Sequence, residues 1–357
     1  MKKTNNLDLF VNFANDVSGR GKLGQDFMSR SWFNLSKKKR TKGIEHYFGR
    51  DKSQYIKIYG SEKTGIANIF DNDVLIYLIT QLRAKMDGRT KVGENEILNA
   101  GILEFSGYDY LLFRNTRMRR KNSRRSNKTI ESIKSKVSEV SGRDYEELWK
   151  SLMRLHNTHC ETNITANGYT FTEAWNFLSS VRKETDRHGR VNGIRVQLCE
   201  YLVNRVQETS SLLTFDADEY FGLSSGVSKW LYLFCRKAAG TGANRQWEES
   251  IESLHSKSGS TDTLRAFRTR IKKIAAKGRL IDYELKYKAG EGGGRDVLVI
   301  RKAASHLIAA DASKSKMAKA ALDESKKILG RYKVDVLENE ETWASRVIDE
   351  DRKKQKR

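Results

Sequence analysis

The segment 261–279 carries basic side chains at a spacing suited to contacts with nucleic acid. Its apolar residues lie 3, 4 and 3 positions apart, which predicts one buried helical stripe made of Leu264, Phe267, Ile271 and Ile274. Seven basic residues lie off that stripe, against the single acid Asp262: Arg265, Arg268, Arg270, Lys272, Lys273, Lys277 and Arg279. An exposed helix of this kind fits the major groove of DNA, where Arg can pair bidentately with guanine.

The elements around this segment predict how it is presented. We expect Ser260 and Thr261 to cap the helix, where free N–H groups can also hold a phosphate. Helices over 227–237 and 248–255 precede it, and a hairpin of strands 281–287 and 296–301 follows, with a Gly-rich tip and with Lys286 and Lys288 near the DNA backbone. This order is that of a winged helix. The alternative is an ordinary solvated basic helix in an α+β domain.

A similar order occurs earlier in the chain. Helices are predicted from Asp71–Asp73 onward, over 95–103 and over 144–155, and Asn167-Gly168 predicts a hairpin over 161–172. Further strands are expected at 55–59, 65–70, 173–184 and 191–198. Arg143, Lys150 and Arg154 lie off the apolar stripe of the third helix. Two tandem winged helices would contact a longer duplex than one.

Two further stretches concentrate positive charge. Residues 37–42 read Lys-Lys-Lys-Arg-Thr-Lys directly after Trp32, Phe33 and Leu35. Residues 114–128 contain eight basic residues and no acid, which indicates either a solvated insertion or a segment that contacts phosphate.

The composition agrees with a polyanionic partner. The chain has 357 residues, with 67 Lys+Arg against 45 Asp+Glu and a net charge of +22, which favours nucleic acid first and an anionic membrane surface second. Three distant cysteines argue against a disulfide scaffold, and no secretory signal or long apolar span is seen, so we expect a cytoplasmic protein. There is no proline, so turns rely on Gly, Asn and Asp.

Residues for catalysis are sparse. The six histidines form no His-x-His pair, which a rolling-circle nuclease would need beside a nucleophilic Tyr, and no Gly-x-x-x-x-Gly-Lys-Ser/Thr loop is present. His156, His159 and Cys160 could suggest a metal site, but a structural zinc wants four ligands, and a packed helix end is the simpler interpretation. We therefore predict no enzyme activity, no cofactor and no metal. A nicking or priming enzyme is the rival from another class.

Several stretches, in order, resemble the plasmid replication initiator protein A (RepA-like) family, which is related to tandem winged-helix initiators that bind iterons. They are 33–41 (FNLSKKKRT), 67–76 (ANIFDNDVLI), 226–232 (GVSKWLY) with Arg236-Lys237, and 254–260 (LHSKSGS). The resemblance implies binding to double-stranded DNA at origin repeats, origin opening, a host initiator and the replicative helicase as partners, and a homodimer that acts as autorepressor. Gly43 and Gly107 depart from the family pattern, where prolines are expected.

We predict an α+β protein with two tandem winged-helix domains. The expected parts are a flexible arm over 1–30, a first domain over 31–205 with a basic insertion near 114–141, a second domain over 206–302, and a helical charged tail over 303–357. The predicted function is sequence-specific DNA binding that initiates plasmid replication in a bacterial cytoplasm; the alternative is a winged-helix transcriptional regulator. Predicted DNA contacts are Ser36, Lys37, Lys38, Lys39, Arg40, Lys42, Arg143, Lys150, Arg154, Lys257, Ser260, Thr261, Arg265, Arg268, Arg270, Lys272, Lys273 and Lys286.

Overall fold

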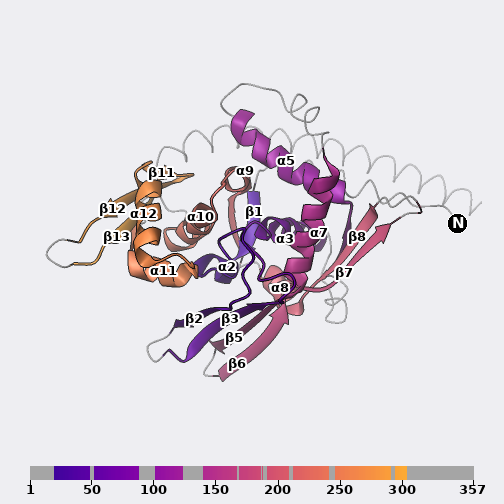
Figure 1. Cartoon of the computed structure of the whole chain (residues 1–357), viewed down its shortest axis with the longest axis horizontal. Coiled ribbons are helices and arrows are strands. Elements are labelled where there is room, and N and C mark those ends of the chain that lie inside the picture. Colours follow the sequence, from indigo (N-terminus) through magenta and orange to yellow (C-terminus); the bar gives the residue numbers. More distant parts are fainter. Residues whose placement is uncertain are drawn as a thin grey trace, which may run out of the picture. The chain divides into compact units, whose positions relative to one another are not determined.

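Helices and antiparallel sheets alternate along the chain in a computed structural model (Figure 1). The fold is a mixed helix-and-sheet fold, as predicted. Met1–Lys302 forms one unit and Ala303–Arg357 a second. The residues that the structure describes are 20–48, 52–87, 101–123, 140–166, 169–185, 187, 191–208, 212–240, 246–290 and 294–303. The expected tail over 303–357 therefore lies almost wholly outside the described residues.

The N-terminal half holds, in chain order, β1 (Arg20–Gly24), α2 (Gln25–Ser29), β2 (Ile44–Phe48), β3 (Gln54–Gly60), α3 (Asn72–Asp87), β4 (Ile102–Phe105), α5 (Gly107–Ser123), α7 (Gly142–His156), β5 (Thr158–Ala166), β6 (Tyr169–Asn176), β7 (Leu178–Thr185), β8 (Val191–Leu198) and α8 (Glu200–Gln207). The C-terminal half holds β9 (Leu212–Asp216), α9 (Ala217–Phe221), α10 (Gly226–Ala238), β10 (Gln246–Ser250), α11 (Ile251–Ser258), α12 (Leu264–Ala275), β11 (Arg279–Leu280), β12 (Tyr283–Lys288) and β13 (Val297–Lys302).

The same arrangement of elements occurs twice. The first repeat is α3–β4–α5–α7–β7–β8, with sheet order β4-β8-β7, and the second is α10–β10–α11–α12–β12–β13, with sheet order β10-β13-β12-β11. In both, the first strand pairs with the last, which pairs with the middle one, and all these pairs are antiparallel. A repeated order of three helices and a hairpin is thus present, as expected, but the second helix and the hairpin of the first repeat are other segments than the predicted ones.

The hairpin expected over 161–172 belongs elsewhere. Strands β5 and β6 join β2 and β3 in a separate antiparallel sheet of order β2-β3-β5-β6. They are inserted between α7 and β7, and the hairpin of the first repeat is β7–β8. The prediction took the strongest turn signal for the repeat's own hairpin, but a turn type does not specify which sheet its strands join.

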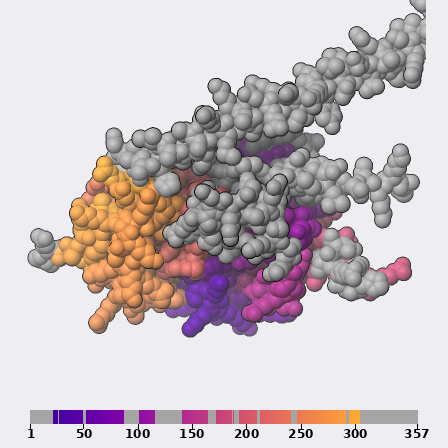
Figure 2. All heavy atoms as spheres, turned by 90° about the horizontal axis from the view of Figure 1, so that it is seen from above, coloured from indigo at the N-terminus to yellow at the C-terminus, as the bar shows by residue number. Residues whose placement is uncertain are grey.

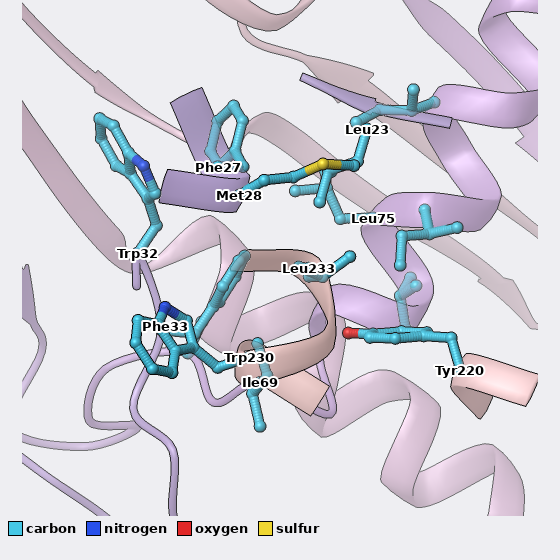
Figure 3. Close-up of a cluster of buried hydrophobic side chains, with 14 of the residues drawn as sticks. Leu23, Phe27, Met28, Trp32, Phe33, Ile69, Leu75, Tyr220, Trp230 and Leu233 are labelled. Carbon is cyan, nitrogen blue, oxygen red and sulfur yellow. The ribbon is translucent and has the colours of Figure 1, made fainter. Parts of the chain in front are cut away.

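The expected flexible arm over 1–30 is wrong for residues 20–29. Strand β1 pairs with β9, and the side chains of Leu23 and Met28 are fully buried (Figure 3). Phe27 contacts Trp32 at a ring-centroid distance of 5.0 Å and lies 6.1 Å from Phe177. Burial of these apolar side chains stabilises β1 and α2, so residues 20–29 are part of the core.

A buried ion pair links the two repeats. Lys229 of α10 places its Nζ 2.8 Å from Oδ1 and 3.1 Å from Oδ2 of Asp73 in α3, and the two side chains are only 1% and 6% exposed. Burial raises the pKa of Asp73 and lowers the pKa of Lys229, and each partner opposes the shift of the other. The repeats therefore share one interior rather than two separable cores.

Some element bounds differ from the prediction. Residues 102–105 form β4, in which the side chains of Leu103 and Phe105 point into the core. The helix predicted over 95–103 is therefore wrong at its C-terminal end. Its earlier part lies outside the described residues. The helix expected over 248–255 begins at Ile251, because Ser250 caps it with a 3.1 Å bond from Ser253 N. Residues 65–70 form turns held by Asp71, whose Oδ2 accepts from Asn68 N at 2.7 Å.

The remaining observations concern the predicted element bounds, the cysteines and the hydropathy of the helices. Helices α7 and α12 and strands β3 and β8 fall within two or three residues of their predicted positions, whereas the single strand predicted over 173–184 is divided between the end of β6 and β7. Cys160, Cys199 and Cys235 are free and buried. Among the described helices, none has both the length and the apolar character that a bilayer crossing requires.

Candidate nucleic-acid interface

Helix α12 buries one stripe and exposes the opposite face. Phe267 and Ile271 are fully buried, and Leu264 and Ile274 pack partly against the core, as their spacing predicted. The cap is Thr263, whose Oγ1 accepts from Ala266 N at 3.3 Å. The capping role predicted for Ser260 and Thr261 is wrong, because the Ser260 hydroxyl instead accepts from Asp262 N at 3.2 Å in the preceding turn.

The exposed face of α12 is positively charged. It carries Arg265, Thr269, Lys272 and Lys273, and Lys277 follows in the next turn. Within the described part of the chain, Arg265, Lys273 and Lys277 have no acidic partner at ion-pair distance. Lys272 extends over the Tyr287 ring of β12, with its Nζ 4.7 Å from the centroid. These cations remain available to an external anion.

Arg268 and Arg270 are engaged within the protein. Arg268 Nε lies 2.7 Å from Asp296 Oδ2, and its Nη2 lies 3.2 Å from Glu252 Oε1. These pairs tie α12 to α11 and to the residue that precedes β13, at the loop end of the β12–β13 hairpin. Arg270 Nε lies 3.0 Å from Asp262 Oδ2. Sequence spacing placed both arginines off the apolar stripe but could not show that Glu252 and Asp296 approach Arg268 or that Asp262 pairs with Arg270.

The basic loop, which we define as residues 36–42, is held next to the turn between α11 and α12. Arg40 donates to three carbonyl oxygens: Nη1 to Gly259 at 2.8 Å, Nη2 to Gly43 at 2.9 Å and Nε to Lys42 at 2.9 Å. Arg40 thus positions the loop, while Lys38, Lys39 and Lys42 are exposed. Lys37 is also exposed, with its Nζ 4.6 Å from the centroid of the Phe70 ring.

Asn34 organises the start of the basic loop, a role that sequence reasoning missed. Its side chain, in a residue only 3% exposed, donates to Lys38 O at 2.7 Å and accepts from Ser36 N at 3.2 Å. The Ser36 hydroxyl in turn accepts from Lys38 N at 3.1 Å. The residue before the loop, Leu35, lies directly on the start of α10, where a Cβ at Gly226 would overlap the Leu35 carbonyl.

His46 joins strand β2 to the end of α11. Its Nδ1 lies 3.1 Å from Ser256 O and its Nε2 lies 3.0 Å from Ser31 O. Burial lowers the pKa of His46, opposed by the Ser31 carbonyl. Gly259, which ends α11 in the left-handed region at φ 60°, leaves room for this contact, since a Cβ there would lie 2.8 Å from Ile44 Cγ2.

The β12–β13 hairpin presents further cations beside α12. Lys286 is exposed, and Lys288 pairs with Glu248 at 2.8 Å. Arg295 is exposed next to the Gly-rich tip, whose residues 291–293 lie outside the described residues. Arg295 directly follows the glycines of the tip, and sequence reasoning missed it because it belongs to no helix or strand pattern. In the space-filling view, α11, α12 and this hairpin form one contiguous surface, coloured orange to yellow (Figure 2).

The first repeat presents a different third helix. In α7, Lys150 Nζ lies 3.1 Å from Glu147 Oε1, and Glu146 and Arg143 are exposed nearby. Arg154 forms a bidentate pair with Asp71, with Nε–Oδ2 and Nη2–Oδ1 distances of 2.7 Å and with the carboxylate 1% exposed. This contact gives Arg154 a structural role in the described fold.

The remaining predicted positions are scattered. Lys257 pairs with Glu249 at 2.8 Å, and Thr261 is exposed. Helix α5 extends through the basic run to Ser123, and residues 124–139 lie outside the described residues. His156 Nδ1 lies 2.8 Å from Leu178 O and His159 Nδ1 lies 3.1 Å from Asn176 Oδ1, so both rings have partners in the fold.

The arrangement brings three groups of cations together. Arg40 links the basic loop to the α11–α12 turn, and Lys272 links the exposed face of α12 to the hairpin. Fixed positive charge of this kind binds a polyanion without regard to sequence, and exposed Arg side chains on a helix can add base readout.

Comparison with known proteins gives a family model, a relative and two crystal structures. The family model described as Replication initiator protein A matches residues 22–285. A relative from Wigglesworthia glossinidia brevipalpis, described as "Putative replication protein", is 28% identical over 232 residues, which cover 62% of this chain and 70% of the relative. Crystal structures of domains 2 and 3 of RctB match with TM-scores of 0.47 and 0.44 at 13% identity. They cover 78% and 76% of this chain and 98% and 95% of the matched chains.

Proposed function

The chain belongs to the Replication initiator protein A family, and from this premise we propose that it binds origin DNA in a sequence-specific manner. In this proposal each repeat is a winged helix. The support for that assignment is the order of helices and strands, which is α–β–α–α–β–β in both repeats with the same strand pairing. The second repeat then places α12 in the major groove and its hairpin against the backbone.

The observation that carries the proposal is the charge of the α12 face. Arg265, Lys272 and Lys273 are exposed on it, and no acidic side chain of α12 is interspersed with them. A helix diameter of ~10–12 Å matches a major groove that is ~12 Å wide. We therefore assign base readout to Arg265 and neighbouring positions of α12, and phosphate contacts to the basic loop, Lys286 and Arg295.

We further propose that binding serves initiation of plasmid replication. In this view the protein occupies repeats at the origin, promotes opening of the adjacent duplex and recruits the host initiator and the replicative helicase in a bacterial cytoplasm. It acts by binding and not by catalysis, and a homodimer form represses its own promoter. The family membership supports the initiator part of this proposal.

A selection experiment tests the proposal. The full chain is incubated with random duplexes and with fragments of a plasmid that carries its gene, at about physiological salt, where counterion competition suppresses non-specific binding. We expect a fragment that bears direct repeats to be retained, and footprinting to show protection on major-groove edges. Retention that is independent of sequence and disappears with salt would contradict specific binding.

A maintenance assay then separates initiation from regulation. The retained fragment is cloned beside a selectable marker without another origin, and the protein is supplied from a second replicon. Maintenance of the marker plasmid is the expected result. Specific retention without maintenance would contradict the initiator proposal and favour the transcriptional regulator.

A further inference from the structure

A cavity of about 260 Å³ lies where α2, α8 and α10 approach the sheet of β2, β3 and β5. Its buried lining is formed by Trp32, Ile56 and Thr162. Its other lining side chains are half-buried, so the cavity opens to solvent on their side. It is separate from the exposed face of α12, to which it contributes no residue.

Aromatic rings form much of the wall. Tyr201 of α8 stacks on Trp175 with ring centroids 4.5 Å apart and an interplanar angle of 12°, and Trp175 stacks on Trp32 at 5.3 Å and 26°. Tyr201 and Trp32 both line the cavity, and Phe48 of β2 lines it as well. A rigid stack of this kind holds its ring faces in fixed orientation, which lowers the entropic cost of binding a flat ligand.

The charged lining residues are all cations: Arg30, Lys237, and Arg205, which pairs with Glu208 at 3.3 Å. The Arg30 guanidinium lies 4.0 Å above the Phe48 ring and forms no hydrogen bond with the described part of the chain. Burial lowers the pKa of Arg30, and the charge of Glu249 opposes this. The Glu249 carboxylate itself is paired with Lys257 at 2.8 Å. Arg30 is thus a partly desolvated cation that an anionic ligand would stabilise.

One lining amide is available for hydrogen bonding. The Asn163 side chain already accepts from Tyr55 N and donates to Ser53 O, both at 2.7 Å. Gln54, by contrast, forms no side-chain bond within the described residues. Its amide offers both a donor and an acceptor, which suits the polar edge of a heterocyclic base.

We propose that this cavity binds a single nucleotide, with the base against the aromatic wall and the phosphate toward the cations. At about 260 Å³ the cavity lies just below the ~300–1,000 Å³ that small-molecule sites typically enclose, which limits it to one base and leaves the rest of the nucleotide at its open side. Aromatic rings that stack bases beside cations that follow the phosphates are the recurring elements of single-strand recognition. The nucleotide is either free in solution or an unpaired base of a single strand. The proposal does not depend on duplex binding by α12.

Other ligand classes fit less well. A metal cation would find no acidic ligand among the lining residues. A purely apolar molecule would leave Arg30 without an anionic partner, and a small inorganic anion would make no use of the aromatic wall. The combination of ring faces, cations and a free amide favours a ligand that has a flat base and a phosphate together.

Isothermal titration calorimetry on the full chain tests the proposal with two pairs of probes. The first pair is deoxyadenosine monophosphate and deoxyribose 5-phosphate, and the second is a thymidine pentamer and its abasic analogue. The variant Arg30→Gln removes the cavity cation. Its matched control Arg195→Gln removes the same charge from an exposed pair with Glu104, on a strand outside the cavity. Gln54→Ala serves as a second variant because it alters no buried side chain.

We expect deoxyadenosine monophosphate to bind at least tenfold more tightly than deoxyribose 5-phosphate. Arg30→Gln should weaken that binding at least tenfold, Gln54→Ala should weaken it less, and Arg195→Gln should leave it unchanged. If the pentamer also binds and competes with the nucleotide, the source is a single strand; if only the nucleotide binds, the source is free nucleotide. Equal binding of base-containing and base-free probes, or equal affinity of Arg30→Gln and Arg195→Gln, would overturn the proposal. Binding of Arg30→Gln to the duplex fragment is measured as well. Unchanged duplex binding distinguishes a failure of the nucleotide proposal from a failure of the proposal that α12 binds duplex DNA.

Discussion

The third helices of the two repeats, α7 and α12, are built on the same plan and used differently. Each buries an apolar stripe, formed by Leu148, Leu152 and Leu155 in α7 and by residues such as Phe267 and Ile271 in α12. The exposed face of α7 mixes Glu146 and Glu147 with its cations, and its Arg154 reaches inward to Asp71. The exposed face of α12 has no acid.

The difference shows that the apolar periodicity of a helix does not determine its function. The apolar stripe determines that a helix packs at this place in the repeat, whereas the charges on the opposite face are free to vary. In α7, Arg154 pairs with Asp71 directly before α3 and so stabilises the position of α3. In α12, acids from outside the helix engage Arg268 and Arg270 and leave Arg265, Lys272 and Lys273 for a partner.

The largest effect is expected from breaking the link between the repeats. Lys229→Met leaves the Asp73 carboxylate buried without its cation, which should lower the free energy of unfolding by about 3–5 kcal/mol. Urea denaturation measures the change. The double variant Lys229→Met/Asp73→Leu removes both charges and should regain most of the loss. If the single variant unfolds like the wild type, the two repeats do not depend on this pair.

Arg154→Met tests the structural use of α7. It removes a bidentate pair from an almost fully buried carboxylate, and because Arg154 itself is 21% exposed we expect a loss of about 2–4 kcal/mol in unfolding free energy. The affinity of the folded variant for the retained DNA fragment, compared at equal folded concentration, should be unchanged. A specific loss of DNA affinity at unchanged stability would instead place Arg154 at the DNA, as the sequence predicted.

Arg265→Ala tests the opposite case on α12. Stability should change by less than ~0.5 kcal/mol because the side chain is exposed. Affinity for the specific fragment should fall by about 1–3 kcal/mol, with relaxed preference at one base pair. Competition binding against the specific and a scrambled duplex measures both quantities. An equal loss on both duplexes would show that Arg265 contacts phosphate alone.

These contrasts explain what the sequence could and could not predict. The stripes of α7 and α12, strands β3 and β8 and the presence of a second unit of three helices and a hairpin follow from local periodicity and turn residues. The pairing of β5 with β3, the burial of Leu23 and Met28, and the partners of Arg154, Arg268 and Arg40 depend on residues far apart in the chain. A basic residue off an apolar stripe looks the same in sequence whether it faces solvent or a carboxylate from another element.

The smallest expected effect is a change in the salt dependence of DNA binding when exposed lysines of the basic loop are removed. Replacement of Lys38, Lys39 and Lys42 by Ala leaves Arg40 and Asn34 to hold the basic loop, so the fold should be unchanged. Each phosphate contact contributes about 0.9 to the slope of log K against log salt, so three lost contacts should flatten the slope by about 2 to 3. The matched variant in the first repeat, Arg143→Ala/Lys150→Ala, removes exposed cations that have Glu146 and Glu147 beside them. If this variant flattens the slope by almost 2, α7 also lies on the DNA and both repeats contact the duplex. If the slope stays unchanged, the acids of α7 already neutralise its exposed face. DNA contact is then confined to the second repeat and the basic loop.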